Sequence, residues 1–131
     1  MSRENVELVQ AIYAAWDRGE SVGHLLADDF EYVNPSNAVE PGIRRDRKAL
    51  VSVRDVYPDF RVEPERYEDV GDEVLVIGTA RGTGASGLEV RWRQGYIWTV
   101  KDGRVTRFRW FNDPAEALAA AGLLRPEPPA G

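Results

Sequence analysis

Residues able to do chemistry are scarce in this sequence. Its 131 residues include no cysteine and a single histidine, His24. Disulfides, zinc fingers, thiolate clusters and cysteine nucleophiles are therefore excluded, and so are metal sites that need two histidines. We expect no metal and no cofactor. Any chemistry must rest on carboxylates, amides, tyrosines, arginines, hydroxyls or this one imidazole.

Nine aromatic and amide side chains are the candidate ligand-binding residues. An apolar surface with a few polar groups that orient a ligand is typical of a small-molecule pocket. The alternative is an ordinary core in which the polar tips of Tyr and Trp find hydrogen-bond partners. The candidates are Trp16, Tyr32, Asn34, Trp92, Gln94, Tyr96, Trp98, Trp110 and Asn112.

The first half of the chain must position some of these residues on helices and one strand. Apolar residues recur every three or four positions between Ser2, a candidate N-cap, and Gly19, which predicts a helix. The expected elements after it are a short helix over 21–27, a strand over 30–34, a long loop over 34–46 and a helix over 47–56. The loop ends in a basic cluster, residues 44–48, which we assign to solvated surface or to a pocket mouth that receives an anion.

The second half changes to the period of strands. Strands are expected over 60–70, 73–83, 88–101 and 104–112, and Asp113-Pro114 opens a last helix that ends at Gly122. Helices followed by a strand meander predict an α+β domain with helices on one face of an antiparallel sheet. Residues 1–124 form one domain, and the Pro-rich residues 125–131 are expected to be a disordered tail.

The last hairpin decides which side chains share the pocket face. A three-residue loop over 101–103 places Trp98 and Phe108 on one face of the sheet. A two-residue loop would place Arg107 on that face instead. Because arginine suits a buried face less well, we expect the three-residue loop.

Charge and hydropathy restrict the partners and the compartment. The net charge of −5 is spread along the chain, whereas a nucleic-acid partner requires a basic stripe, so none is expected. No apolar run approaches the roughly 20 residues that span a bilayer, and no signal-like apolar segment follows the first residues. We expect no membrane partner and a cytoplasmic location.

Several stretches resemble the SnoaL-like branch of the nuclear transport factor 2-like superfamily, and the likeness covers about residues 3–124. The stretches are residues 4–20, 26–32 (LADDFEY), 60–65 (FRVEPE), 98–105 (WTVKDGRV) and 115–123 (AEALAAAGL). The resemblance implies a cone in which a strongly curved mixed or antiparallel sheet wraps around N-terminal helices, with a short C-terminal helix and a deep pocket. Similar proteins include ketosteroid isomerases, polyketide cyclases and limonene-epoxide hydrolases.

The positions that carry acid or base groups in these relatives hold other residues here. The base Asp of the isomerases falls on Asn34 and their helix Tyr falls on Ile12. Their second Asp and the His of the cyclases fall on Tyr96, and the last-strand Asp of cyclases and hydrolases falls on Trp110. This deficit favours binding over catalysis.

Three functions are therefore weighed. The first is binding of a small, mostly apolar molecule with one or two oxygens. The second is an isomerase, cyclase or hydrolase whose acid is one of four carboxylates, namely Asp17, Glu31, Asp46 and Asp113. The third is a structural or partner-binding domain with a filled pocket.

A homodimer is expected from the family resemblance and from the sheet face opposite the pocket. There Ile97, Val105 and Phe111 lie among arginines. Protein interfaces tolerate such a mixture of apolar residues and arginine well.

Overall fold

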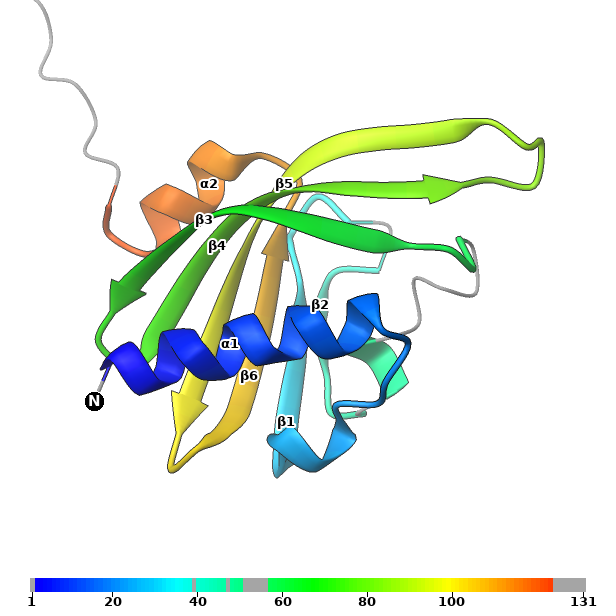
Figure 1. The fold of residues 1–131 in the computed structure, drawn as a ribbon. Coiled ribbons are helices and arrows are strands. Elements are labelled where there is room, and N and C mark those ends of the chain that lie inside the picture. The colour runs from blue at the N-terminus through cyan, green and yellow to red at the C-terminus, as the bar shows by residue number, and fades with distance from the viewer. Residues whose placement is uncertain (1, 39, 47, 51–56, 124–131) are drawn as a thin grey trace, which may run out of the picture.

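The fold places one curved sheet between two helices (Figure 1). The structure is a computed structural model that describes residues 2–38, 40–46, 48–50 and 57–123. Six strands form a single sheet in the order β2-β1-β6-β5-β4-β3. In chain order the elements are α1 (Ser2–Asp17), the 3-10 helix η1 (Gly23–Leu25), β1 (Leu26–Asn34), β2 (Gly42–Arg44), β3 (Arg61–Val70), β4 (Glu73–Thr83), β5 (Glu89–Lys101), β6 (Arg104–Phe111) and α2 (Pro114–Ala120).

The long elements agree with the sequence-based predictions. The predicted bounds of β4 are those observed, and those of β3, β5 and β6 differ by one residue. The predicted N-cap of α2 is confirmed, because the Asp113 side chain accepts a hydrogen bond from the backbone N–H of Ala115 at 2.9 Å. The α+β class is therefore correct, with the difference that the sheet is mixed, since β1 runs parallel to β6.

The short elements differ from the predictions. Of the helix predicted over 21–27, only Gly23–Leu25 are helical, as the 3-10 turn η1. β1 begins at Leu26, because Leu26 pairs with Val105 and is buried in the core. The predicted loop over 34–46 contains β2, which pairs antiparallel with Tyr32–Asn34. Three residues are too few to show a periodic pattern in the sequence. Ser2 is itself helical rather than the N-cap.

Two predicted segments lie wholly or partly outside the described residues. Of the helix expected over 47–56, only residues 48–50 are described, and they form a 3-10 turn. The tail expected over 125–131 also lies outside the described part of the chain.

The β5–β6 hairpin places Trp98 and Phe108 on one face of the sheet, as predicted, but with a different loop and register. Its loop has two residues, Asp102 and Gly103, both with positive φ, so the predicted three-residue loop is wrong. A β-bulge follows, because Val100 pairs with Val105 while Thr99 pairs with Arg107. The extra residue reverses the side-chain parity of β6. Trp98 therefore lies opposite Phe108, and Tyr96 lies opposite Trp110.

The two faces of the sheet carry separate hydrophobic clusters. The concave face and α1 form the main core, which includes Val9, Ile12, Val76 and Trp98. The convex face carries a smaller cluster in which Leu75, Ile77 and Ile97 pack under Ala117 of α2 and under its C-cap, Ala121. Alternation of side chains along each strand produces this division.

Ile97 and Val105 do not lie where the expected dimer interface requires them. Ile97 is fully buried within the cluster under α2, and Val105 belongs to the main core on the other face. Phe111 is partly buried against the convex cluster. Val105 lies on the concave side because the two-residue loop pairs it with Val100, and the bulge after it returns the arginines of β6 to the convex side.

Substitution of Gly95 tests the packing of α2 on the sheet. A Cβ at this position would lie 2.3 Å from the Ala117 Cβ and 3.3 Å from the Ile77 Cδ1, so α2 would have to move. We expect Gly95→Ala to lower the free energy of unfolding by ~1–3 kcal/mol, measured by urea denaturation. Gly84→Ala is the control, since its Cβ would meet only Tyr57 at 3.8 Å.

A double-mutant cycle assigns the effect to the contact with α2. If Gly95→Ala acts through Ala117, the same substitution should cost less in an Ala117→Gly background. An equal cost in both backgrounds, or a change below about 0.5 kcal/mol for Gly95→Ala alone, would contradict the packing described here.

Candidate functional site

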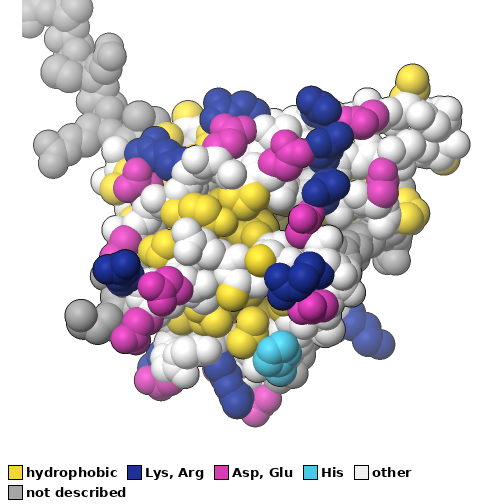
Figure 2. Space-filling model, in the orientation of Figure 1, with side chains coloured by type: hydrophobic (Ala, Val, Ile, Leu, Met, Phe, Trp, Pro, Cys, Tyr) yellow, Lys and Arg dark blue, Asp and Glu magenta, His cyan; other side chains and the backbone are white. Residues whose placement is uncertain are grey.

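A cavity of about 510 Å³ lies between the concave face of the sheet and the N-terminal part of the chain. In Figure 2, hydrophobic side chains gather at the centre of the face that carries α1 and β3, and charged side chains surround them. The lining residues come from α1, from the strands β1, β2, β3, β5 and β6, and from the segments next to them. They are Tyr13, Trp16, Tyr32, Asn34, Ala38, Glu40, Arg44, Leu50, Phe60, Val62, Trp92, Gln94, Tyr96, Phe108, Trp110 and Asn112.

Eight of the nine candidate residues line this cavity, and Trp98 does not. The Trp98 side chain is fully buried in the main core. Its Nε1 donates a hydrogen bond to the Tyr13 hydroxyl at 3.0 Å, and its ring centroid lies 4.4 Å from that of Phe108. Trp98 is therefore a core residue that packs against the lining residues Tyr13 and Phe108.

The strand period of two brings most of the lining residues together. Tyr32 and Asn34 project from β1, Gln94 and Tyr96 from β5, and Phe108 and Trp110 from β6. The centre of this surface is Phe108. Its ring centroid lies 5.4 Å from that of Tyr32 on one side and 5.8 Å from that of Tyr96 on the other. These three rings form a continuous aromatic wall across three neighbouring strands.

The first polar group on the wall is a hydrogen-bonded pair. The Trp110 Nε1–H donates to the Oδ1 of Asn34 at 2.7 Å, between β6 and β1. Trp110 and Asn34 are both partly exposed. The indole therefore holds the amide of Asn34 in one orientation at the cavity surface.

The second polar group is a chain of three side chains. The Tyr96 hydroxyl donates to Gln94 Oε1 at 2.7 Å, and Gln94 Nε2 donates to Asn112 Oδ1 at 3.4 Å. Gln94 and Tyr96 are buried, whereas Asn112 is exposed. Buried polar groups are stable when they are hydrogen-bonded to one another. This series of hydrogen bonds runs from the buried Tyr96 to the exposed Asn112.

The tyrosines of the cavity remain protonated at ordinary pH. Burial raises the pKa of Tyr32 to about 12, and the nearby Arg44 guanidinium opposes part of that shift. Burial also raises the pKa of Tyr96, with a smaller contribution from Tyr32, and raises that of Tyr13. All three phenols are therefore hydroxyl groups that can donate a hydrogen bond, and none is a base at neutral pH.

Two charged residues lie where the cavity meets solvent. Glu40 and Arg44 line it, and both side chains are exposed. Arg44 is paired with Asp46, with 3.6 Å between Nη2 and Oδ2. Of the described lining residues, Glu40 alone carries a carboxylate.

Sequence reasoning missed eight of the lining residues. Tyr13 was identifiable, because it lies three positions before Trp16 and therefore on the same helix face. Phe108 shares the strand parity of Trp110. The other six lie on the short strand β2, on β3 or in the irregular segments next to them, where no periodic pattern points to the cavity. They are Ala38, Glu40, Arg44, Leu50, Phe60 and Val62.

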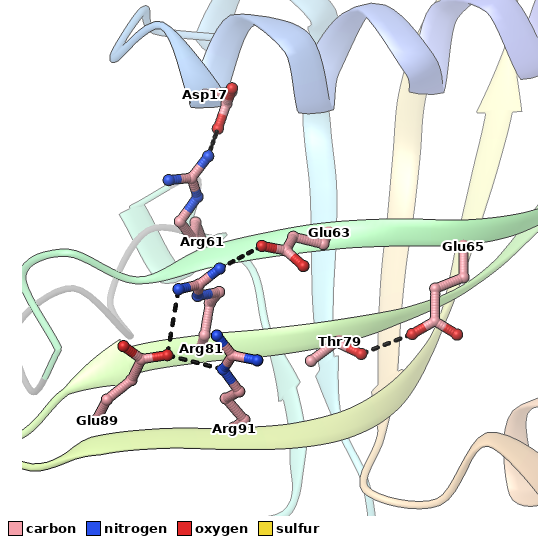
Figure 3. Close-up of polar contacts among 8 residues, drawn as sticks. All are labelled: Asp17, Arg61, Glu63, Glu65, Thr79, Arg81, Glu89 and Arg91. Carbon is pink, nitrogen blue, oxygen red and sulfur yellow. Dashed lines mark hydrogen bonds and ion pairs between the residues drawn. The ribbon is translucent and has the colours of Figure 1, made fainter.

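The four acids considered for an enzyme lie outside the cavity. Asp17 at the end of α1 pairs with Arg61, as Figure 3 shows, beside further acid–arginine contacts across β3, β4 and β5. Glu31 accepts hydrogen bonds from Arg107, whose guanidinium lowers the pKa of that carboxyl. Asp113 caps α2, and Asp46 pairs with Arg44. His24 is exposed and does not line the cavity.

Two further searches cover the described part of the chain. No group of three or more His, Cys, Asp or Glu side chains there is arranged to hold a metal ion. None of the helices in that part is long and apolar enough to cross a bilayer.

Solved structures share this fold at low sequence identity. Bal32a, from a soil-derived mobile gene cassette, is 20% identical with a TM-score of 0.73, covering 95% of this chain and 98% of its own. An NTF2-like protein of unknown function from Burkholderia pseudomallei is 22% identical with a TM-score of 0.72, covering 88% and 95%. TerC, co-crystallized with polyporic acid, is 23% identical with a TM-score of 0.71, covering 91% and 98%.

The family assignment rests on a sequence profile as well as on the fold. No curated protein matches the sequence. The profile of the SnoaL-like domain matches residues 9–108, which include the second half of α1 and most of the sheet. With this match, and with the NTF2-like cone observed in the structure, the chain belongs to the SnoaL-like domain family.

Proposed function

We propose that this protein binds a small, mostly apolar molecule with one or two oxygen atoms in the cavity. One observation carries the proposal: a cavity of about 510 Å³ has aromatic walls and two separate hydrogen-bonded polar groups. Its volume lies within the roughly 300–1,000 Å³ of small-molecule sites. Apolar walls with a few fixed polar groups are the usual composition of such sites.

Aromatic residues supply the apolar contact. Trp16 of α1, Trp92 of β5 and Phe108 and Trp110 of β6 contribute flat aromatic surfaces to the cavity lining. Trp92 is itself supported by Tyr57 and Phe60, with ring centroids 5.6 Å and 6.0 Å away. Flat, rigid walls favour a planar apolar ligand, because removing the apolar surfaces of ligand and wall from water gains about 25 cal/mol per Å² of buried surface.

Internal hydrogen bonds hold the polar groups before a ligand enters. The Asn34 amide is fixed by Trp110, and the Gln94 amide by Tyr96. Side chains that are already ordered lose little conformational entropy when a ligand binds. The polar groups therefore favour a ligand whose oxygens match their positions.

The arrangement favours binding over catalysis or a filled structural core. The acids considered for catalysis are engaged elsewhere, and the relatives' catalytic positions hold Asn34, Tyr96 and Trp110. A cavity of this size argues against a pocket filled by its own aromatic side chains. TerC, which shares the fold, was crystallized with an organic ligand, polyporic acid.

A cavity-filling substitution tests where a ligand binds. We expect fluorenone, a flat aromatic ketone, to bind saturably to the wild-type protein in equilibrium dialysis. Val62→Trp places an indole on a lining position of β3 and should weaken this binding by about tenfold or more. Asp69→Trp adds the same side chain at an exposed position of β3 that does not line the cavity and should leave binding unchanged. Equal affinity of wild type and Val62→Trp would contradict the assignment.

Two tyrosine substitutions separate stability from binding. Tyr96→Phe removes the donor to the buried Gln94 Oε1 and should lower the free energy of unfolding by about 1–3 kcal/mol. Tyr32 has no hydrogen-bond partner among the described residues, so Tyr32→Phe should change stability by less than about 0.5 kcal/mol. It should nevertheless weaken fluorenone binding about two- to tenfold. Urea denaturation and dialysis measure the two effects, and the reverse ranking of stabilities would contradict these roles.

A further inference from the structure

The indole of Trp110 determines which end of the Asn34 amide is available to a ligand. An indole N–H can only donate a hydrogen bond, so the group facing it must be the amide oxygen. The distance from Trp110 Nε1 to Asn34 Oδ1 is 2.7 Å, which is a short hydrogen bond of this type. The Nδ2 amino group of Asn34 then points away from Trp110, and no described residue accepts a hydrogen bond from it.

Two neighbouring groups add donors to the same surface. Tyr32 precedes Asn34 by two residues, so both side chains lie on one face of β1, about 6.6 Å apart along the strand. The raised pKa of Tyr32 keeps its hydroxyl protonated. On the opposite side, Asn112 Oδ1 accepts from Gln94, which leaves the Asn112 amino group as a further donor near the opening.

The amide oxygens on the cavity surface are used internally, whereas the Tyr32 hydroxyl oxygen can still accept a hydrogen bond. The amide oxygens of Asn34, Gln94 and Asn112 each accept a hydrogen bond from another side chain. The carboxylate of Glu40 is exposed to solvent. A ligand inside the cavity therefore meets amide donors that have no acceptor among the described residues, and a ligand that covers such a donor without pairing with it loses binding free energy.

We propose that Asn34, oriented by Trp110, makes the cavity selective for an aromatic carbonyl compound. The carbonyl oxygen has no hydrogen of its own and accepts from the Asn34 amino group. A ligand of the same shape that offers only an N–H or O–H donor can pair with the Tyr32 hydroxyl oxygen, but it offers no acceptor to the Asn34 amino group. Asn34 is the specificity-determining residue and Trp110 its positioning residue. This inference rests on the proposed binding function and names the ligand class for that cavity.

Three ligands of one shape test the inference. Fluorenone carries a carbonyl acceptor, carbazole carries an N–H donor, and fluorene carries neither. We expect the wild-type protein to bind fluorenone about tenfold more tightly than fluorene, and carbazole less tightly than fluorenone. Dissociation constants come from equilibrium dialysis of the full chain, with each compound measured separately.

Substitutions at Asn34 and Trp110 then change the preference in stated directions. Asn34→Asp keeps an oxygen for the Trp110 N–H but replaces the amino donor with a second acceptor, so carbazole should bind more tightly than fluorenone. Trp110→Phe removes the group that orients the amide, and Asn34→Leu removes the amide itself. Both should reduce the fluorenone-to-fluorene ratio towards one without adding a charge, whatever they do to overall affinity.

The outcomes separate this inference from the proposed function. If all three compounds bind the wild-type protein saturably and with equal affinity, the cavity binds aromatic molecules but the carbonyl preference is overturned. If none of them binds saturably, the proposed function itself fails for ligands of this size. If Asn34→Asp does not fold, judged by its thermal unfolding, the wild-type ratios and the Trp110→Phe ratio still decide the question. Retention of the wild-type ratio in Trp110→Phe would overturn the positioning role.

Discussion

The single extra residue in β6 is the constraint on which the site depends. A regular two-residue hairpin would turn Arg107 and Arg109 to the concave face, where they would meet the apolar side chains of β5. The bulge between the Val100–Val105 and Thr99–Arg107 pairs reverses this parity. Val105 can then face the core in one part of the strand, while Phe108 and Trp110 face the concave side further along. The arginines remain on the convex side with their acidic partners.

Burial by α1 separates core from cavity on that concave face. Trp98 and Trp110 belong to the same hairpin face, yet only Trp110 lines the cavity. Tyr13 of α1 covers Trp98 and accepts its N–H, and their ring centroids are 5.6 Å apart. Trp110 lies beyond this contact, and its N–H finds Asn34 instead. Tryptophan thus packs in the core at position 98 and orients a polar side chain at the cavity surface at position 110.

The polar groups of the cavity are organised by an indole N–H and a phenol hydroxyl. The indole N–H can only donate, and the raised pKa of Tyr96 keeps its hydroxyl protonated and able to donate at neutral pH. Each donates to the oxygen of an amide, Asn34 or Gln94, and so determines the direction of that amide. Such a wall recognises a ligand through the geometry of hydrogen bonds from neutral side chains, with little change in the charge of protein or ligand. It is a chemistry available to a chain without cysteine, with one exposed histidine, and with its candidate acids engaged elsewhere.

The sequence by itself determined the long elements, the family resemblance and eight side chains of the cavity, because strand alternation and helix spacing are local properties. Only the tertiary structure decided the rest. β2 and the early start of β1 exist through pairing with distant strands, and Trp98 belongs to the core because Tyr13 covers it. Glu40, Arg44 and Val62 reach the cavity through the curvature of the sheet and the path of a loop. These depend on contacts between residues far apart in the chain, which no local periodicity encodes.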